Sequence, residues 1–153
     1  GTLSAFENAY AGVVYCAGLS GAQAREEAHK ALDDVGLSND RRDKAAGDLT
    51  VFERKQLMIA SAIAGRPRIL LLDEPAAGLT RPEVSDLAEL IRTVNGRGVT
   101  ILLIEHVLPL LLSVSQHLLI LNHGAVIASG KPAEVVRDPQ VVEAYLGKRE
   151  AAL

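Results

Sequence analysis

The sequence predicts an α/β fold that has a helical lobe at its N-terminus and a mainly parallel sheet after it. Over the first part of the chain, apolar side chains recur every three or four positions, as they do on amphipathic helices. Later, two short and largely apolar runs, 69–72 and 99–104, are typical of parallel strands that are covered on both faces. We therefore expect a helical subdomain over residues 1–65 and an α/β subdomain over residues 66–153.

Length and composition fit one compact domain. The chain has 153 residues, of which 48% are hydrophobic, and its 16 basic and 19 acidic residues give a net charge of −3. Only 3% of the residues are aromatic and none is tryptophan. The exposed rings and basic charge of a base-stacking nucleic-acid platform are therefore missing. A single cysteine and four scattered histidines do not form a zinc site. We expect a protein of the reduced cytosol that binds no nucleic acid.

No membrane span is predicted. The most apolar stretch, 99–121, is interrupted by charged and polar residues, so it falls short of the ~18 consecutive apolar residues that a span requires. The first residues lack the features of a signal peptide. They also lack an initiating methionine, which indicates a processed or excised piece of a longer chain.

Three helices are predicted in the first 65 residues. Two helically spaced stripes mark the first two: Leu3, Phe6, Tyr10, Val13 and Ala17, then Ala24, Ala28, Ala31, Leu32 and Val35. The charged segment Asn39–Asp48 is expected to be a solvated connection, with a nucleic-acid patch as a poor second interpretation. Thr50 and Glu53 have the spacing of a capping box, which predicts a third helix from Thr50 to about Ala64.

The second part of the chain alternates strand and helix. An amphipathic helix over 84–94, opened by a second capping box at Thr80 and Glu83, connects the two apolar runs into a strand–helix–strand unit. A tight hairpin is expected from strands at 118–121 and 125–128. Two short helices should follow it, around 132–137 and 141–146.

Two adjacent carboxylates, Asp73 and Glu74, follow the first apolar run. Ligands of open α/β sheets bind beyond the carboxyl ends of the strands, and Mg²⁺ is bound through one or two carboxylates together with substrate phosphates. The pair therefore suits a magnesium site, with a loop-facing acidic pair as the alternative. His106 follows the second run and would emerge on the same rim if the strands are neighbours; otherwise it is a structural histidine.

In these segments the chain resembles the ATP-binding cassette (ABC) ATPases, which have a P-loop NTPase core. Leu70–Pro75 resembles their Walker B strand, Ala76–Thr80 their D-loop and Ile104–His106 their switch histidine, while Leu49–Leu57 stands in the place of the signature motif. Together with the ending Ala144–Gly147, the pattern is most similar to the ATPase subunits of branched-chain amino acid importers.

The resemblance implies a role for each site residue. Asp73 would hold Mg²⁺ through a water, Glu74 would polarise the water that attacks ATP, and His106 would hydrogen-bond the γ-phosphate. The signature and D-loop residues would meet the ATP of a second ATPase subunit: Leu49, Thr50, Val51, Phe52, Glu53, Ala77, Gly78 and Thr80. ATP and Mg²⁺ are thus the implied cofactors. Transmembrane permease subunits are the further partners, and the location is peripheral, on the cytoplasmic face of the membrane.

Three features depart from the family pattern. The signature Leu-Ser-Gly-Gly-Gln is replaced by Leu49–Glu53, which keeps a capping hydroxyl but has no glycine, and the D-loop ends in Thr80 instead of Asp. No phosphate loop of the form G-x-x-x-x-G-K-[ST] occurs in the 153 residues. The chain therefore resembles the C-terminal two-thirds of an ATPase subunit and alone should be inactive. The alternative is a non-catalytic interaction or assembly module on the same fold.

The missing part should also leave a gap in the sheet. We expect the family's phosphate-loop strand to lie between the strand that ends at Asp73 and the strand that precedes His106. Without it, the chain is expected to rearrange its strands or to associate through uncovered apolar edges.

Overall fold

The computed structural model describes residues 3–146, so Gly147 of the predicted C-terminal motif lies outside the described residues. The chain forms two compact units, which divide between Glu105 and His106. The subdomain boundary expected at residue 65 stays a prediction. In the described part of the chain, no helix has the length and apolar character that crossing a membrane needs.

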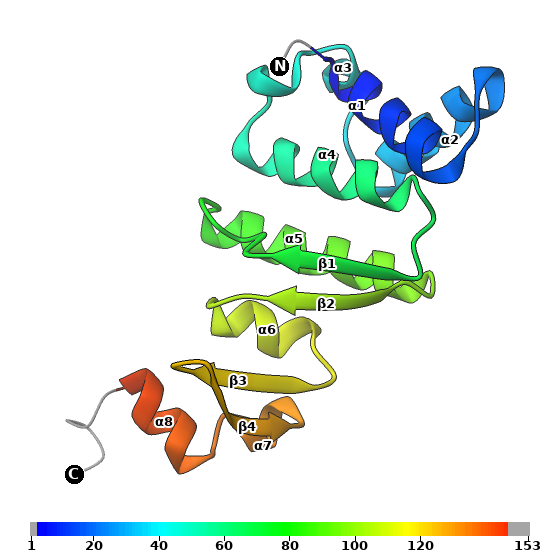
Figure 1. Cartoon of the computed structure of the whole chain (residues 1–153). Coiled ribbons are helices and arrows are strands. Elements are labelled where there is room, and N and C mark those ends of the chain that lie inside the picture. The colour runs from blue at the N-terminus through cyan, green and yellow to red at the C-terminus, as the bar shows by residue number, and fades with distance from the viewer. Residues whose placement is uncertain (1–2, 147–153) are drawn as a thin grey trace. The chain divides into compact units, whose positions relative to one another are not determined.

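The first unit begins with helices, as predicted (Figure 1). They are α1 (Ala5–Gly12), the π-helix η1 (Val13–Ala17), α2 (Gly21–Asp34), α3 (Asn39–Arg42), the 3₁₀ helix η2 (Ala46–Asp48) and α4 (Val51–Ile63). Helices α1, α2 and α4 contact one another pairwise and form the core of this part. The predicted stripe of α2 is confirmed, because all five of its residues are buried.

The predicted stripe of the first helix is only partly buried: Val13 is fully buried, whereas its other members are half-buried or exposed. The fully buried residues of α1 are Ala5 and Ala9, and Val13, the first residue of η1, is fully buried as well. In contrast, Leu3 is 48% exposed. The cause is close packing: Gly12 approaches the main-chain carbonyl of Ser61 in α4 so closely that a Cβ atom would collide with it. Small residues therefore occupy the contact, and the larger apolar ones lie beside it.

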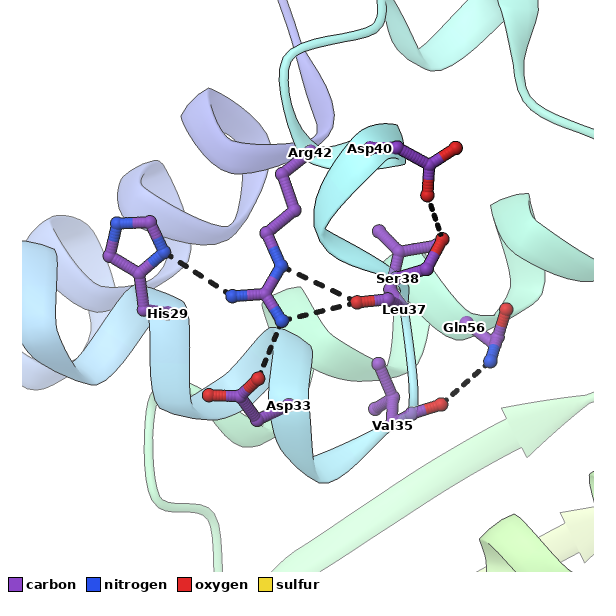
Figure 2. Close-up of polar contacts among 8 residues, drawn as sticks. All are labelled: His29, Asp33, Val35, Leu37, Ser38, Asp40, Arg42 and Gln56. Carbon is purple, nitrogen blue, oxygen red and sulfur yellow. Dashed lines mark hydrogen bonds and ion pairs between the residues drawn. The ribbon is translucent and has the colours of Figure 1, made fainter.

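The segment predicted as a solvated connection contains a buried arginine. Arg42, at the end of α3, is only 8% exposed. Its guanidinium donates to the Leu37 carbonyl from Nε (3.4 Å) and Nη2 (3.2 Å), and Nη2 also lies 2.5 Å from Asp33 Oδ1 (Figure 2). The third partner is His29 Nδ1, 3.4 Å from Nη1. The planar guanidinium of Arg42, with its five N–H donors, thus links α2 to α3 through hydrogen bonds.

A strand–helix–strand unit completes the first compact unit, as predicted. It consists of β1 (Ile69–Asp73), α5 (Arg81–Gly96) and β2 (Thr100–Ile104). The strands pair in parallel, from Ile69 with Thr100 to Asp73 with Ile104. The expectation of a missing strand between them is therefore wrong, because β1 and β2 are hydrogen-bonded neighbours.

In the first unit, over the residues that the structure describes, one face of the β1–β2 pair is covered and the other is exposed, which corrects the expectation of two covered faces. Leu70 and Leu72 of β1 are buried, whereas the alternate residues are exposed. In β2 the same alternation leaves Leu102 54% exposed and Ile104 57% exposed. Because side chains of a strand point alternately to the two faces, these residues form one uncovered apolar face.

The second unit contains the predicted hairpin and one helix that the sequence did not indicate. Its elements are α6 (Leu108–Val114), β3 (Leu118–Asn122), β4 (Ala125–Gly130), α7 (Pro132–Val135) and α8 (Pro139–Leu146). β3 and β4 are antiparallel, with a register shift after Ile120. The turn between them holds His123 and Gly124 at positive φ, 48° and 80°.

Candidate functional site

The carboxyl ends of β1 and β2 meet, and the acidic pair lies there. Asp73 is the last residue of β1, is exposed and pairs with Ile104. Glu74 extends this pairing by one hydrogen bond, from its N–H to the Ile104 carbonyl at 2.9 Å. The predicted position of both carboxylates at the carboxyl edge of a parallel strand pair is thus confirmed.

Glu74 has an unusual backbone conformation. Its φ is +44°, in the left-handed region that side chains with a Cβ seldom adopt. The next residue, Pro75, is buried and restricts the turn that follows. The Glu74 carbonyl then accepts the N–H of Ala77 at 3.1 Å, which closes a four-residue turn. The backbone therefore presents Glu74 at a sharp bend at the end of the strand.

A second turn leads from this bend into α5. The Ala76 carbonyl accepts the N–H of Leu79 at 3.1 Å, and Gly78 has a φ of +80°, a conformation for which glycine is suited. At the start of the helix, Glu83 Oε2 accepts hydrogen bonds from both the N–H and the hydroxyl of Thr80, each at 2.7 Å. Thr80 therefore holds the end of the predicted D-loop against α5.

The sequence singled out no role for Glu105, but its side chain joins the two strand ends. Glu105 directly follows β2, and its Oε1 accepts the N–H of Ala76 at 2.6 Å. Such a short bond to a carboxylate is among the stronger hydrogen bonds in proteins. The signal available in the sequence was a third carboxylate at the end of the neighbouring strand.

The other expected phosphate-contacting element is the N-terminus of α4. The predicted capping box is present: Thr50 Oγ1 accepts the Glu53 N–H at 3.2 Å, and Glu53 Oε2 accepts the Thr50 N–H at 2.8 Å. Glu53 Oε1 also pairs with Arg41 at 2.9 Å. The Glu53 carboxylate is thus turned back onto its own helix end, as the spacing of the capping box predicted.

Val51 and Phe52, which stand in the place of the signature glycines, have different surroundings. Val51 is 37% exposed and lies beside Gly78, so that a Cβ atom on Gly78 would be 3.5 Å from Val51 Cγ1. Phe52 is half-buried and lines an open pocket that also includes Gly36 and Gln56. The structure therefore brings the signature position and the D-loop together within the first unit. Leu49 is buried, and its carbonyl accepts a hydrogen bond from Arg54.

His106 is the first residue of the second unit and is exposed. Among the described residues, no group of three or more His, Cys, Asp or Glu side chains could hold a metal ion. Asp73 and Glu74 alone suit an ion such as Mg²⁺, which keeps several waters and takes its remaining ligands from substrate phosphates. The donor set therefore fits the cation implied by the sequence.

Comparison with models of known protein families shows which family the chain belongs to. A sequence model of the ABC transporter family matches residues 1–77, half of the chain. The chain belongs to the ABC transporter family. A model described as "Branched-chain amino acid ATP-binding cassette transporter" matches residues 125–151 as well.

Curated relatives of this ABC transporter chain are substantially longer. It is 42% identical to the high-affinity branched-chain amino acid transport ATP-binding protein BraF of Pseudomonas aeruginosa, over 82% of the chain and 49% of BraF. Identity to LivG of Escherichia coli, which has the same description, is 37% over the same shares. The lipopolysaccharide export system ATP-binding protein LptB of Haemophilus influenzae is 34% identical, over 96% of the chain and 61% of LptB. The chain thus spans about half the length of BraF and LivG.

Solved structures confirm the predicted fold class. The ADP conformation of MJ1267, described as an ATP-binding cassette of an ABC transporter, superposes with a TM-score of 0.81 at 29% identity, over 96% of this ABC transporter chain and 64% of MJ1267. A putative metal-chelate type ABC transporter has a TM-score of 0.85 at 18% identity, over 95% of the chain and 59% of that structure, which shows a shared fold alone.

Proposed function

We propose that this chain is part of the ATP-hydrolysing subunit of an ABC importer for branched-chain or other hydrophobic amino acids. The observation that carries the proposal is the acidic pair at the end of β1, held at a sharp bend beside the end of β2. The amino acid substrate is supported by the match at residues 125–151 and by the similarity to BraF and LivG. The weaker similarity to LptB makes lipopolysaccharide export the competing substrate class.

In the proposed hydrolysis of ATP, the two carboxylates of the acidic pair have different roles. Asp73 would hold Mg²⁺ through a water, and the bound ion would supply positive charge to neutralise the phosphates of ATP. Glu74 accepts a hydrogen bond from the attacking water and polarises it as a general base. The exposure of both side chains and the bend at Glu74 support this division, because they leave the carboxylates accessible at the strand end.

The remaining residues would act on phosphate and on the partner subunit. His106 hydrogen-bonds the γ-phosphate. The N-terminus of α4, with Thr50 as its cap, directs backbone N–H groups toward the ATP of a second ATPase subunit. In the D-loop, Ala77, Gly78 and Thr80 approach the same site. The phosphate-binding loop is assigned to a segment outside these 153 residues, so the 153-residue chain alone should not hydrolyse ATP.

The full subunit would bind transmembrane permease subunits and lie on the cytoplasmic face of the membrane. Its helical part, α1–α4, is the region proposed to contact the permease. The proposal that the protein functions as a pair of ATPase subunits fits the family to which the chain belongs.

A non-catalytic interaction module is the second candidate, and one observation favours it. Val51 and Phe52 carry side chains where the family signature has glycines, which hinders a close approach of phosphate to the backbone N–H groups at the start of α4. In this alternative the fold is kept for assembly and not for turnover.

Replacing Glu74 tests the proposed function. The full-length protein, reconstituted in vesicles with its permease subunits, should hydrolyse ATP and take up labelled leucine. Glu74→Gln should lower hydrolysis by at least about a hundredfold, the order of a lost general base, with ATP binding retained. Glu89→Gln on the exposed side of α5 is the matched control and should leave both activities unchanged. A wild-type protein that binds its partners without turnover would instead support the module.

A further inference from the structure

Glu105 makes a contact that crosses from one strand end to the other. It stands one residue beyond β2, and its Oε1 accepts the N–H of Ala76 at 2.6 Å. Ala76 is only 4% exposed, and Glu105 is half-buried. An N–H in such a position needs a partner within the protein, since losing it would leave a buried polar group unsatisfied.

This contact lies inside the turn that presents Glu74. The Glu74 N–H is bonded to the Ile104 carbonyl, and the Glu74 carbonyl is bonded to the Ala77 N–H. Ala76 lies between these two anchors, in the turn that begins at Glu74. Because Glu74 has a φ of +44°, the turn is one that a residue with a Cβ does not favour by itself. The hydrogen bond from the Ala76 N–H to the Glu105 carboxylate helps to hold this turn in its conformation.

We propose that Glu105 is a positioning residue for ATP hydrolysis: its carboxylate holds the Glu74–Ala77 turn, so that the Glu74 side chain is presented to the attacking water. The inference rests on the proposed function. Glu105 acts through a backbone N–H and touches neither substrate nor metal in this role. What it must supply is a hydrogen-bond acceptor of the right reach, and its charge is not required.

Two variants separate the acceptor from the charge. Glu105→Gln keeps an oxygen at the same distance from the backbone, whereas Glu105→Leu keeps the size of the side chain and removes the acceptor. In the full-length protein, Glu105→Leu should lower kcat for ATP hydrolysis by at least about tenfold, because small misplacements of a catalytic group reduce the rate strongly. The KM for ATP should stay within about twofold of wild type, and Glu105→Gln should retain kcat within about threefold. Glu89→Leu, at an exposed position of α5, serves as the matched control.

Amide hydrogen exchange provides the second measurement. In wild type and Glu105→Gln the Ala76 N–H should exchange slowly, and in Glu105→Leu it should exchange at least about tenfold faster. Equal kcat in Glu105→Leu and wild type would overturn the proposal, as would a loss in Glu105→Gln equal to that in Glu105→Leu. A fast-exchanging Ala76 N–H in wild type would also overturn it, even if Glu105→Leu failed to fold. A wild-type protein without ATP turnover would instead refute the proposed function, and the exchange of Ala76 would still decide whether Glu105 holds the turn.

Discussion

Val51, the first residue of α4, lies beside Gly78 in the loop that follows the acidic pair: a Cβ atom on Gly78 would be 3.5 Å from Val51 Cγ1. The two positions are 27 residues apart along the chain (78 − 51), and both belong to segments that resemble phosphate-contacting motifs. Gly78 needs its φ of +80° for the turn before α5. The Val51 side chain thus fills the space beside this turn, where a glycine would leave the backbone accessible.

The position of Val51 beside this turn predicts the effect of restoring a glycine. In the full-length protein, Val51→Gly should lower the KM for ATP at least about twofold, because a phosphate can approach the N–H groups of α4 more closely when the Cβ is removed. ATP hydrolysis measured over a range of ATP concentrations checks this. Val51→Thr keeps the branched shape and should leave KM unchanged. An unchanged or higher KM in Val51→Gly would show that Val51 does not limit access.

The strand–helix–strand unit could be predicted because its signals are local. An apolar run ending in Asp73, a capping box at Thr80 and a second apolar run each specify their own segment, and parallel pairing follows from the crossover helix. The exposed face of β1 and β2 could not be predicted this way. A continuous apolar run shows that both faces of a strand are apolar, but not whether another element covers both.

Other features depended on contacts between distant segments. The buried face of α1 is set by how closely Gly12 approaches α4, and the burial of Arg42 depends on carbonyl and carboxylate groups from α2 and the loop after it. Neither contact has a periodic signal in the sequence. The role of Glu105 was missed for the same reason, because its partner Ala76 is 29 residues away and offers only a backbone N–H.

The close approach of α1 and α4 predicts a large effect of a small substitution. Gly12→Ala would place a Cβ against the main-chain carbonyl of Ser61, which cannot move without displacing α4. Overpacking of this kind lowers the free energy of unfolding by about 1–3 kcal/mol. Urea unfolding of the full-length protein measures it. Gly47→Ala is the matched control, since a Cβ on Gly47 meets no atom within 4 Å, and the change should stay within about 0.5 kcal/mol.

Arg42 should matter far more for stability than exposed arginines. Arg42→Met keeps much of the side-chain volume but removes the donors to the Leu37 carbonyl and Asp33, which Figure 2 shows around the guanidinium. Leaving a buried carbonyl without a partner should lower the free energy of unfolding by about 1–3 kcal/mol. Arg25→Met, at the cation–π contact with Tyr10, should cost less than about 1 kcal/mol. Equal losses in the two variants would contradict the structural role of the Arg42 network.

The cap of α5 predicts a measurable titration. The N–H of Thr80, and then its hydroxyl, hold the pKa of Glu83 below its usual value. Because the folded pKa is below the unfolded one, the stabilising contribution is present above the unfolded pKa and is lost as the pH falls through the folded pKa. The cap of α5 should therefore weaken on acidification, and Glu83→Gln should remove this part of the pH dependence.

Substituting Thr80 separates the two donors. Thr80→Val removes the hydroxyl and keeps the N–H, so the pKa of Glu83, followed by NMR, should rise only part of the way to its usual value. Asp40 is the internal control: a hydrogen bond from the Ser38 hydroxyl lowers its pKa, and nothing in that pair changes with Thr80. A full return of the Glu83 pKa to its usual value would mean that the hydroxyl alone sets it. No change at all would mean that the N–H alone does, and either result would contradict a cap in which both donors hold the carboxylate.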